Sequence, residues 1–155
     1  MRHGKSSWDF SVSDRDRPLE ERGISDAHLV ASALENLDLK IHASFSSPAN
    51  RALHTAMIVL RTLDFPFSKF HISNDLYDFS GESVVQFVKD LDDKLETVLI
   101  FGHNHAFTQI VNAFGNQYIE NVPTAGLVQL NFEVDKWSDI VNGITKKSLF
   151  PKHIK

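Results

Sequence analysis

Residues 97–104 read Thr97-Val98-Leu99-Ile100-Phe101-Gly102-His103-Asn104. Its first five residues form a continuous apolar run, with the length and β-branched character typical of a strand buried on both faces. The run ends at Gly102, and apolar residues at helical spacing follow from Phe107 to Phe114. His103 is therefore predicted at the junction of a buried strand and a helix. In an open α/β sheet, ligands bind where strands end and helices begin.

The rest of the chain continues this alternation of strands and helices. The apolar periodicity predicts helices over 19–37, 49–60, 84–91 and 107–114, strands over 41–46, 97–101 and 127–134, and a short strand within 65–75. Ser47-Pro48 is typical of a helix start, because serine caps free amides and proline at the first helical position loses no hydrogen bond. Residues 5–18 read as a polar loop. Such alternation favours a mainly parallel sheet covered by helices.

The C-terminal part of the chain predicts an antiparallel edge. Residues 127–134 alternate between apolar and polar, and 135–136 are expected to turn into a second strand around 140–141. We expect residues 146–155 to be a solvated end. The predicted fold class is a single-domain α/β three-layer sandwich, with helices on both faces of a mainly parallel central sheet.

Composition excludes several classes of protein. The 155 residues carry a formal net charge of −4, which argues against a nucleic-acid binder. There is no cysteine, so a disulfide framework, a thiolate metal site and a cysteine nucleophile are all impossible. No apolar stretch reaches the ~18 residues of a membrane span, and no membrane partner is expected. Without a recognisable secretory leader, the predicted location is cytoplasmic.

Two histidines and two arginines are predicted to meet at one edge of the sheet. Arg2 and His3 begin the chain, Arg51 falls in the first turn of a predicted helix, and His103 follows the buried strand. A neutral imidazole is a capable nucleophile, and a guanidinium matches phosphate oxygens two at a time. A helix start also attracts anions through its free amides. The four residues therefore predict a cationic pocket for a phosphoryl group.

Five ordered segments give the chain a resemblance to the histidine phosphatase superfamily, and within it to the SixA-like branch of phosphohistidine phosphatases. These segments are Arg2-His3-Gly4-Lys5-Ser6-Ser7-Trp8, Asp16-Arg17-Pro18-Leu19 with Arg22-Gly23, Ser46-Ser47-Pro48 through Arg51, Gly102-His103-Asn104, and Pro123-Thr124-Ala125-Gly126. The resemblance implies a phosphoglycerate-mutase-like fold over residues 1–155. It also implies a central strand before Arg-His-Gly, where this sequence has only Met1.

That departure leaves two interpretations of the chain start. We expect the first strand to be truncated, with an upstream segment that would supply the rest. The alternative is a protein that lacks much of a middle strand, which would hold His3 loosely and weaken or abolish activity.

The resemblance also implies roles for the four residues. His3 would become phosphorylated, while Arg2, Arg51 and His103 would bind the phosphoryl group. Ser6 and Arg17 are further candidates for contact with the substrate, although a purely structural role fits them equally. The implied activity is hydrolysis of phosphohistidine or other phosphoryl groups without a metal or other cofactor. The expected partner is a phosphorylated protein or a small phosphorylated metabolite, and the oligomeric state stays open.

The sequence shows no distinctive general acid to protonate a leaving group. Asp75, Asp78 and Glu82 offer no distinctive general acid, so we expect substrates with good leaving groups, above all phosphohistidine. A broad-specificity phosphomonoesterase of the same family and a catalytically silent phosphate-binding regulatory protein remain open. His103 and His105 form a His-x-His pair, but a zinc site needs at least three protein ligands and no third is close in sequence.

Overall fold

The computed structural model describes residues 1–155 and contains the predicted parallel sheet. Strand β1 (Ala43–Ser46) lies between β2 (Phe70–Ile72) and β3 (Val98–Phe101), and both pairings are parallel. In the register of β1 and β3, Ala43 lies opposite Val98 and Ser46 opposite Phe101. The carboxyl ends of β1 and β3 are therefore level, which brings the residues that follow them to one edge.

The antiparallel edge is confirmed, but its second strand lies further along the chain than expected. Strand β4 (Leu127–Asn131) pairs with β5 (Ile144–Leu149), whereas the strand expected around 140–141 is wrong. Ile140 is instead buried at 4% exposure, after the short 3-10 helix η4 (Trp137–Asp139). The end of the chain, 146–155, is mostly exposed but ordered. Strand β5 and helix α5 (Pro151–Ile154) fill most of it, and the Lys155 ammonium pairs with the buried Asp26 carboxylate at 3.2 Å.

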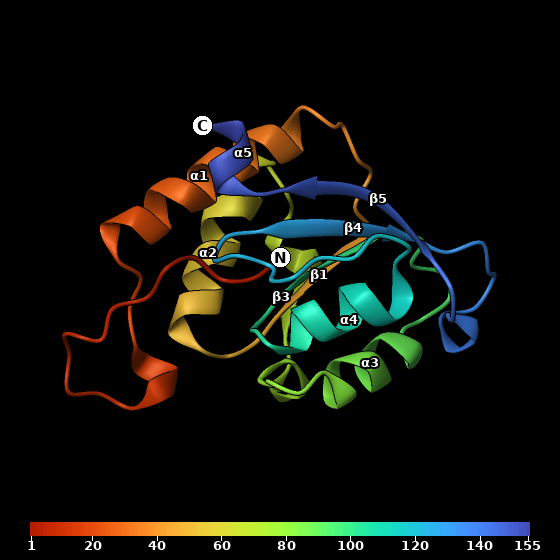
Figure 1. The fold of residues 1–155 in the computed structure, drawn as a ribbon, viewed down its shortest axis with the longest axis horizontal. Coiled ribbons are helices and arrows are strands. Elements are labelled where there is room, and N and C mark those ends of the chain that lie inside the picture. The colour runs from red at the N-terminus through yellow and green to blue at the C-terminus, as the bar shows by residue number, and fades with distance from the viewer.

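Helices cover both faces of the strands (Figure 1). Helices α1 (Glu21–Glu35) and α2 (Asn50–Thr62) pack on one face, where their apolar stripes meet Leu99 and Phe101 in the largest core cluster. Helices α3 (Glu82–Lys89) and α4 (Ala106–Phe114) lie on the other face, above a cluster that includes Ala43 and Phe45. The three-layer α/β fold class is confirmed. No helix is long and apolar enough to cross a membrane.

Residues 1–3 lie between β3 and β4 and hydrogen-bond to both sides. Arg2 forms a parallel bridge with Gly102, and the Arg2 amide donates to the Gly126 carbonyl at 2.9 Å. The Met1 α-amino group donates to the Ile100 carbonyl at 2.7 Å. His3 is only 8% exposed. The backbone of His3 is hydrogen-bonded on both sides, to Gly102 at 3.1 Å and to Ala125 at 2.9 Å.

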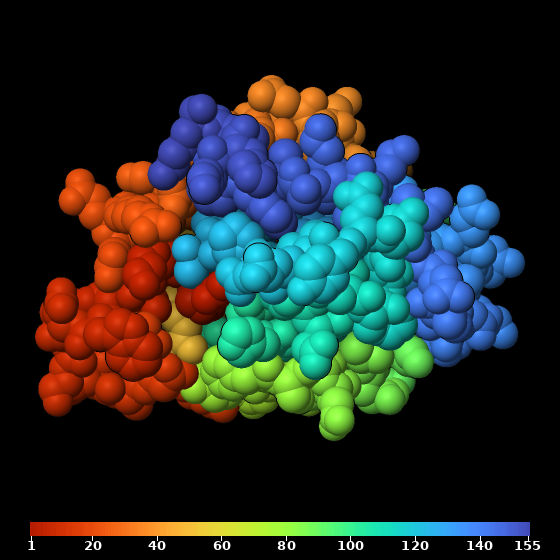
Figure 2. All heavy atoms as spheres, viewed as in Figure 1, coloured from red at the N-terminus to blue at the C-terminus, as the bar shows by residue number.

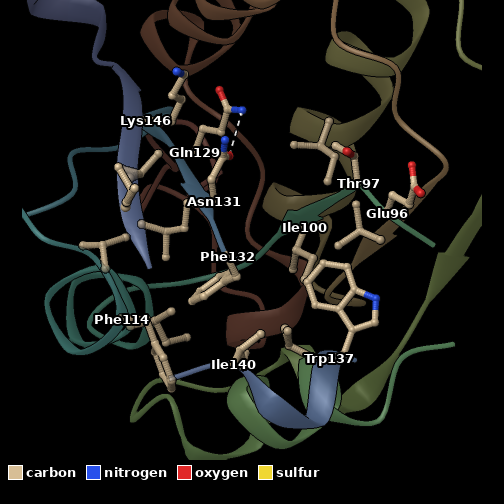
Figure 3. A pocket seen from close by; sticks show the side chains of 18 of the residues that line it. Glu96, Thr97, Ile100, Phe114, Gln129, Asn131, Phe132, Trp137, Ile140 and Lys146 are labelled. Atoms are coloured by element: carbon tan, nitrogen blue, oxygen red, sulfur yellow. Dashed lines mark hydrogen bonds between the residues drawn. The ribbon is translucent and has the colours of Figure 1, made fainter. Parts of the chain in front are cut away.

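A cavity of about 990 Å³ continues from Met1 between β3 and β4 (Figure 3). The edge of β3 borders it on one side and β4 on the other, and Phe114, Trp137 and Ile140 close its floor. Val98 and Ile100 point to one face of β3, line the cavity and are only half-buried. The sequence predicted burial of this strand on both faces, and the cavity is the reason that one face is less covered.

The loop that follows Gly4 projects at one end of the molecule (Figure 2). Its neck is closed where the Ser7 amide donates to the Pro18 carbonyl at 2.8 Å and the Glu20 amide donates to the Lys5 carbonyl at 2.8 Å. The neck lies directly against the first turn of α1. A Cβ atom added to Gly23 would stand 2.2 Å from the Lys5 carbonyl oxygen, so only glycine permits this approach.

Candidate active site

Three separate segments bring His3, Arg51 and His103 together at the carboxyl edge of the sheet. His3 ends the short extended segment, Arg51 lies in the first turn of α2, and His103 follows β3. All three side chains are buried, with residue exposures of 8%, 2% and 1%. The predicted meeting of these residues is confirmed, because each follows an element that ends at the same edge.

The surroundings of His3 fix which of its ring nitrogens carries the proton. Nδ1 lies 2.7 Å from the Gly4 carbonyl oxygen, which can only accept a hydrogen bond. Nδ1 must therefore carry the hydrogen, and Nε2 keeps its lone pair. The Arg51 Nε–H donates to that Nε2 at 3.3 Å, which agrees with this tautomer. His3 thus presents an unprotonated nitrogen inside the pocket.

His103 lies beside His3, with one ring nitrogen hydrogen-bonded and the other without a partner. Its Nε2 is 2.7 Å from the Ser47 hydroxyl, whereas its buried Nδ1 has no hydrogen-bond partner. The centroids of the two imidazole rings are 5.3 Å apart. A buried polar atom without a partner is unusual in a folded protein and calls for an explanation. A bound anion with a protonated imidazole would satisfy the free nitrogen.

Arg2 supplies the second guanidinium of the site. Its Nη1 donates to the Val122 carbonyl at 2.8 Å, while its Nε is buried without a partner. Its positive charge lowers the pKa of both His3 and His103, so the guanidinium lies near both rings. The structure therefore brings His3, Arg51 and His103 into contact, and the charge of Arg2 acts on both rings.

The electrostatics of the pocket keep both histidines neutral at pH 7. Burial lowers the pKa of His3 to about 3, and the positive charge of Arg51 contributes. Burial likewise lowers the pKa of His103 to about 3, again with a contribution from Arg51. Two guanidiniums, of which only Arg51 is paired with a carboxylate, and two neutral imidazoles make this a site that favours an incoming anion.

Ser6 and Arg17 are placed together, but in the neck of the loop. The Arg17 guanidinium donates to the Ser6 hydroxyl and, through Nε, to the Ser7 carbonyl at 3.1 Å. The indole of Trp8 stacks on the same guanidinium, whose central carbon lies 3.3 Å from the ring centroid. Both predicted residues are buried, and neither hydrogen-bonds to His3, Arg51 or His103.

Sequence reasoning missed Asp14 and Tyr77. Asp14 accepts hydrogen bonds from Arg51 and Tyr77, and the Tyr77 ring packs edge-on against His103 with centroids 5.3 Å apart. The spacing of Asp14 and Arg17 is a partial signal for Asp14. Residues three apart on a helical turn can form an ion pair, and these two do so. Nothing in the sequence indicated that Tyr77 reaches the site.

None of the three acidic residues considered as general acids is placed as a proton donor in the pocket. Asp78 accepts hydrogen bonds from the backbone amides of Gly81 and Val84 at the start of α3, at 3.0 and 3.1 Å. Although its burial acts in the opposite direction, these bonds lower its pKa, which suits a carboxylate and not a proton donor. Asp75 and Glu82 are exposed.

His105 is exposed and does not join His103 in a metal site. No group of three or more histidine, cysteine, aspartate or glutamate side chains is placed to hold a metal ion.

The fold and the pocket together define a class: α/β domains with a buried histidine beside arginine side chains at the carboxyl edge of a parallel sheet. The model of the histidine phosphatase superfamily (branch 1) matches residues 1–83, which is more than half of the chain. The chain belongs to that superfamily.

A relative matches nearly the whole chain, and solved structures share its fold. An uncharacterized protein of Mycobacterium tuberculosis is 27% identical over 153 residues, which covers 92% of this chain and 93% of that protein. The structure of the protein histidine phosphatase SixA complexed with tungstate has a TM-score of 0.84 at 23% identity, over 100% of this chain and 97% of that one. A phosphoserine phosphatase of Entamoeba histolytica, solved with 3-phosphoglyceric acid, has a TM-score of 0.67 at 17% identity, over 99% and 96%. The fold is therefore SixA-like.

Proposed function

We propose that this chain is a phosphatase that transfers a phosphoryl group from its substrate to His3 and then to water. The observation that carries the proposal is the fixed tautomer of His3, whose unprotonated Nε2 lies 3.3 Å from the Arg51 Nε. The lowered pKa of His3 keeps this nitrogen unprotonated at neutral pH. A nucleophile that needs no deprotonation can attack phosphorus directly.

The reaction would proceed in two balanced steps. In the first, the Nε2 lone pair of His3 forms a bond to phosphorus while the bond to the leaving group breaks, and the leaving group keeps that electron pair. In the second, water attacks the phosphorus, the bond to Nε2 breaks, and inorganic phosphate leaves. Arg2, Arg51 and His103 would hold the three equatorial oxygens in both steps, which is the stabilisation that phosphoryl transfer requires. The two guanidiniums supply the positive charge, so we propose that no metal takes part.

The carboxylates near the pocket support a substrate with a good leaving group. Asp78 is engaged by backbone amides, and the Asp14 carboxylate is held by Arg51 and Tyr77. Neither is a proton donor for an alkyl oxygen. A phosphohistidine whose ring is protonated leaves as neutral imidazole and needs no such donor. We propose phosphohistidine as the substrate group, and the SixA-like fold supports this choice.

The rim of the site supports a phosphoryl group carried on a protein. Phe79, whose ring lies 5.0 Å from that of His103, is 45% exposed, and Trp8, which stacks on Arg17, is 73% exposed. Exposed aromatic side chains beside a pocket are typical of surfaces that contact other proteins. A small sugar phosphate would leave this rim unused.

Turnover of three substrates tests the proposal. A phosphohistidine peptide, p-nitrophenyl phosphate and a sugar phosphate would be compared with wild-type protein and with His3→Ala, each with and without a chelator. We expect hydrolysis of the first two, little of the third, no effect of the chelator, and loss of activity in His3→Ala. Comparable turnover of the sugar phosphate would instead favour a broad phosphomonoesterase. Phosphate binding without any turnover would favour a regulatory protein.

A further inference from the structure

Asp14 holds the outer edge of the Arg51 guanidinium. Its backbone carbonyl accepts from Arg51 Nη1 at 2.6 Å, and its carboxylate Oδ2 accepts from Nη2 at 2.9 Å. The third nitrogen, Nε, donates to His3. Because the guanidinium is planar and rigid, two fixed terminal nitrogens also fix the direction of the Nε–H. The Arg51 side chain is 3% exposed and that of Asp14 is 42% exposed, so these contacts join a buried guanidinium to a carboxylate at the surface.

The Asp14 carboxylate is itself held from two further directions. The Tyr77 hydroxyl donates to Oδ2, and Arg17 Nη1 donates to Oδ1 at 3.1 Å. Tyr77 also packs against His103, and the Arg15 guanidinium covers the tyrosine ring at 4.4 Å from its centroid. Asp14 therefore connects the loop, helix α2 and the segment around Tyr77 at a single carboxylate.

The charge of Asp14 is unfavourable for binding a phosphoryl group. Burial raises the pKa of Asp14, but hydrogen bonds from Tyr77, Arg51 and Arg17 outweigh it and hold the pKa well below its usual range. The residue is a carboxylate at neutral pH, and like charges close together repel. A negative charge beside an anion pocket calls for a compensating role. Orientation of the neighbouring guanidinium is the role that the hydrogen bonds provide.

We propose that Asp14 is a positioning residue for phosphoryl transfer, which fixes Arg51 so that its inner edge faces the phosphoryl group on His3. Tyr77 in turn fixes Asp14. This inference rests on the proposed transfer to His3. It separates orientation from charge, because Asp14 is expected to help catalysis through its hydrogen bonds and to oppose phosphate binding through its charge.

Three variants separate these two effects. Asp14→Ala removes both the side-chain acceptor and the charge, Asp14→Asn keeps an oxygen that can accept from Arg51 Nη2, and Asp9→Asn removes one charge from an exposed position in the same loop. For each, kcat and KM with p-nitrophenyl phosphate, the Kd for inorganic phosphate, and the melting temperature are measured. Displacement of a catalytic group by about 1 Å can cost on the order of a hundredfold in rate.

We expect kcat of Asp14→Ala to fall by about ten- to a hundredfold, and Asp14→Asn to recover most of the loss. Asp14→Asn should also bind inorganic phosphate more tightly than wild type, by roughly two- to fivefold, because a repulsive charge is gone. Asp9→Asn should match wild type in kcat and Kd. The inference is overturned if kcat of Asp14→Ala stays within about twofold of wild type, or if Asp14→Asn is as defective in kcat as Asp14→Ala.

A second measurement does not depend on turnover. In an NMR spectrum of the arginine side chains, the Arg51 Nε–H should exchange slowly with water in wild type and in Asp14→Asn, and rapidly in Asp14→Ala. Equal exchange in all three would contradict the positioning role. If wild type shows no turnover but this exchange pattern holds, the proposed hydrolysis fails while the positioning of Arg51 stands.

Discussion

The Gly4 carbonyl selects the reactive nitrogen of His3. Because a carbonyl oxygen only accepts, it places the hydrogen on Nδ1 and leaves Nε2 to face Arg51. His103 is arranged in a comparable way, since the Ser47 hydroxyl takes its Nε2 and leaves its Nδ1 free. Each imidazole is thus oriented by one short contact with a neighbour. We therefore predict that catalysis depends on the partners that orient the two imidazoles as well as on the histidines themselves.

Ser47→Ala tests this at the partner of His103. The substitution removes the contact that orients the ring, and we expect kcat/KM to fall about tenfold, which corresponds to about 1.4 kcal/mol of lost transition-state stabilisation. Steady-state kinetics with p-nitrophenyl phosphate measures the effect. The matched control is Ser44→Ala on β1, the strand that Ser47 follows; its equally buried hydroxyl donates to the Leu99 carbonyl at 3.0 Å, away from the site. Equal kcat/KM in the two variants would contradict an orienting role for Ser47.

The residues that the sequence predicted and those it missed differ in how they reach the pocket. His3, Arg51 and His103 each follow an element that ends at the carboxyl edge of the sheet, so topology alone brings them together. Asp14 and Tyr77 come from loops, and loop conformation depends on contacts such as the bond between these two side chains. No local periodicity encodes such a contact, which is why sequence reasoning did not find it.

At the scale of elements, the docking of the loop on helix α1 depends on two glycines in contact. A Cβ at Gly4 would lie 2.6 Å from the Gly23 carbonyl oxygen, and a Cβ at Gly23 would lie 2.2 Å from the Lys5 carbonyl oxygen. Both are backbone atoms that no side-chain rotation can move away. The loop carries Asp14 and Arg17, so this contact also sets the position of the groups that hold Arg51.

Gly23→Ala should therefore separate the loop from the helix. We expect the free energy of unfolding to fall by about 1–3 kcal/mol, in spite of the better helix propensity of alanine, because the added methyl overpacks backbone against backbone. Urea denaturation measures this, and catalytic activity should fall with it. Ser32→Ala, at an exposed position of the same helix, provides the control and should change stability by less than about 0.5 kcal/mol. A Gly23→Ala protein as stable and active as this control would show that the close approach is not required.

The elements themselves were predicted most reliably where the periodicity was strong. The structure contains a helix at each of the four predicted positions, although α2 begins at Asn50, two residues after Pro48. The last strand was misplaced, because Ile140-Val141 is apolar but short, while β5 contains Lys146 and Lys147 and reads as polar. An exposed strand held mainly by its partner β4 leaves little apolar signal in the sequence.

In the molecule as a whole, two buried histidines tie stability to pH. Burial lowers the pKa of His3 and His103 to about 3, from 6.5. Between the folded and unfolded pKa values, the unfolded state binds more protons than the native state. The free energy of unfolding should therefore decrease as pH falls from 6.5 to 3.

Urea midpoints measured across this pH range check the dependence. His103→Asn should flatten the decrease between pH 6.5 and 3, because one of the two depressed histidines is gone. His54→Gln, which replaces an exposed histidine on α2, should leave it unchanged. Stability that is constant between pH 8 and 4, or that rises on acidification, would mean that these groups are not held neutral.

Phosphoryl transfer requires a covalent bond between His3 and phosphorus. Rapid mixing of the protein with a labelled phosphohistidine peptide, followed by quenching in alkali and mass spectrometry, detects that bond directly. We predict an acid-labile phosphoryl group on the fragment of this protein that contains His3, formed before phosphate appears in solution, and none in His3→Ala. Release of phosphate by wild type with no labelled His3 at any time, or with the label on His103 instead, would contradict it.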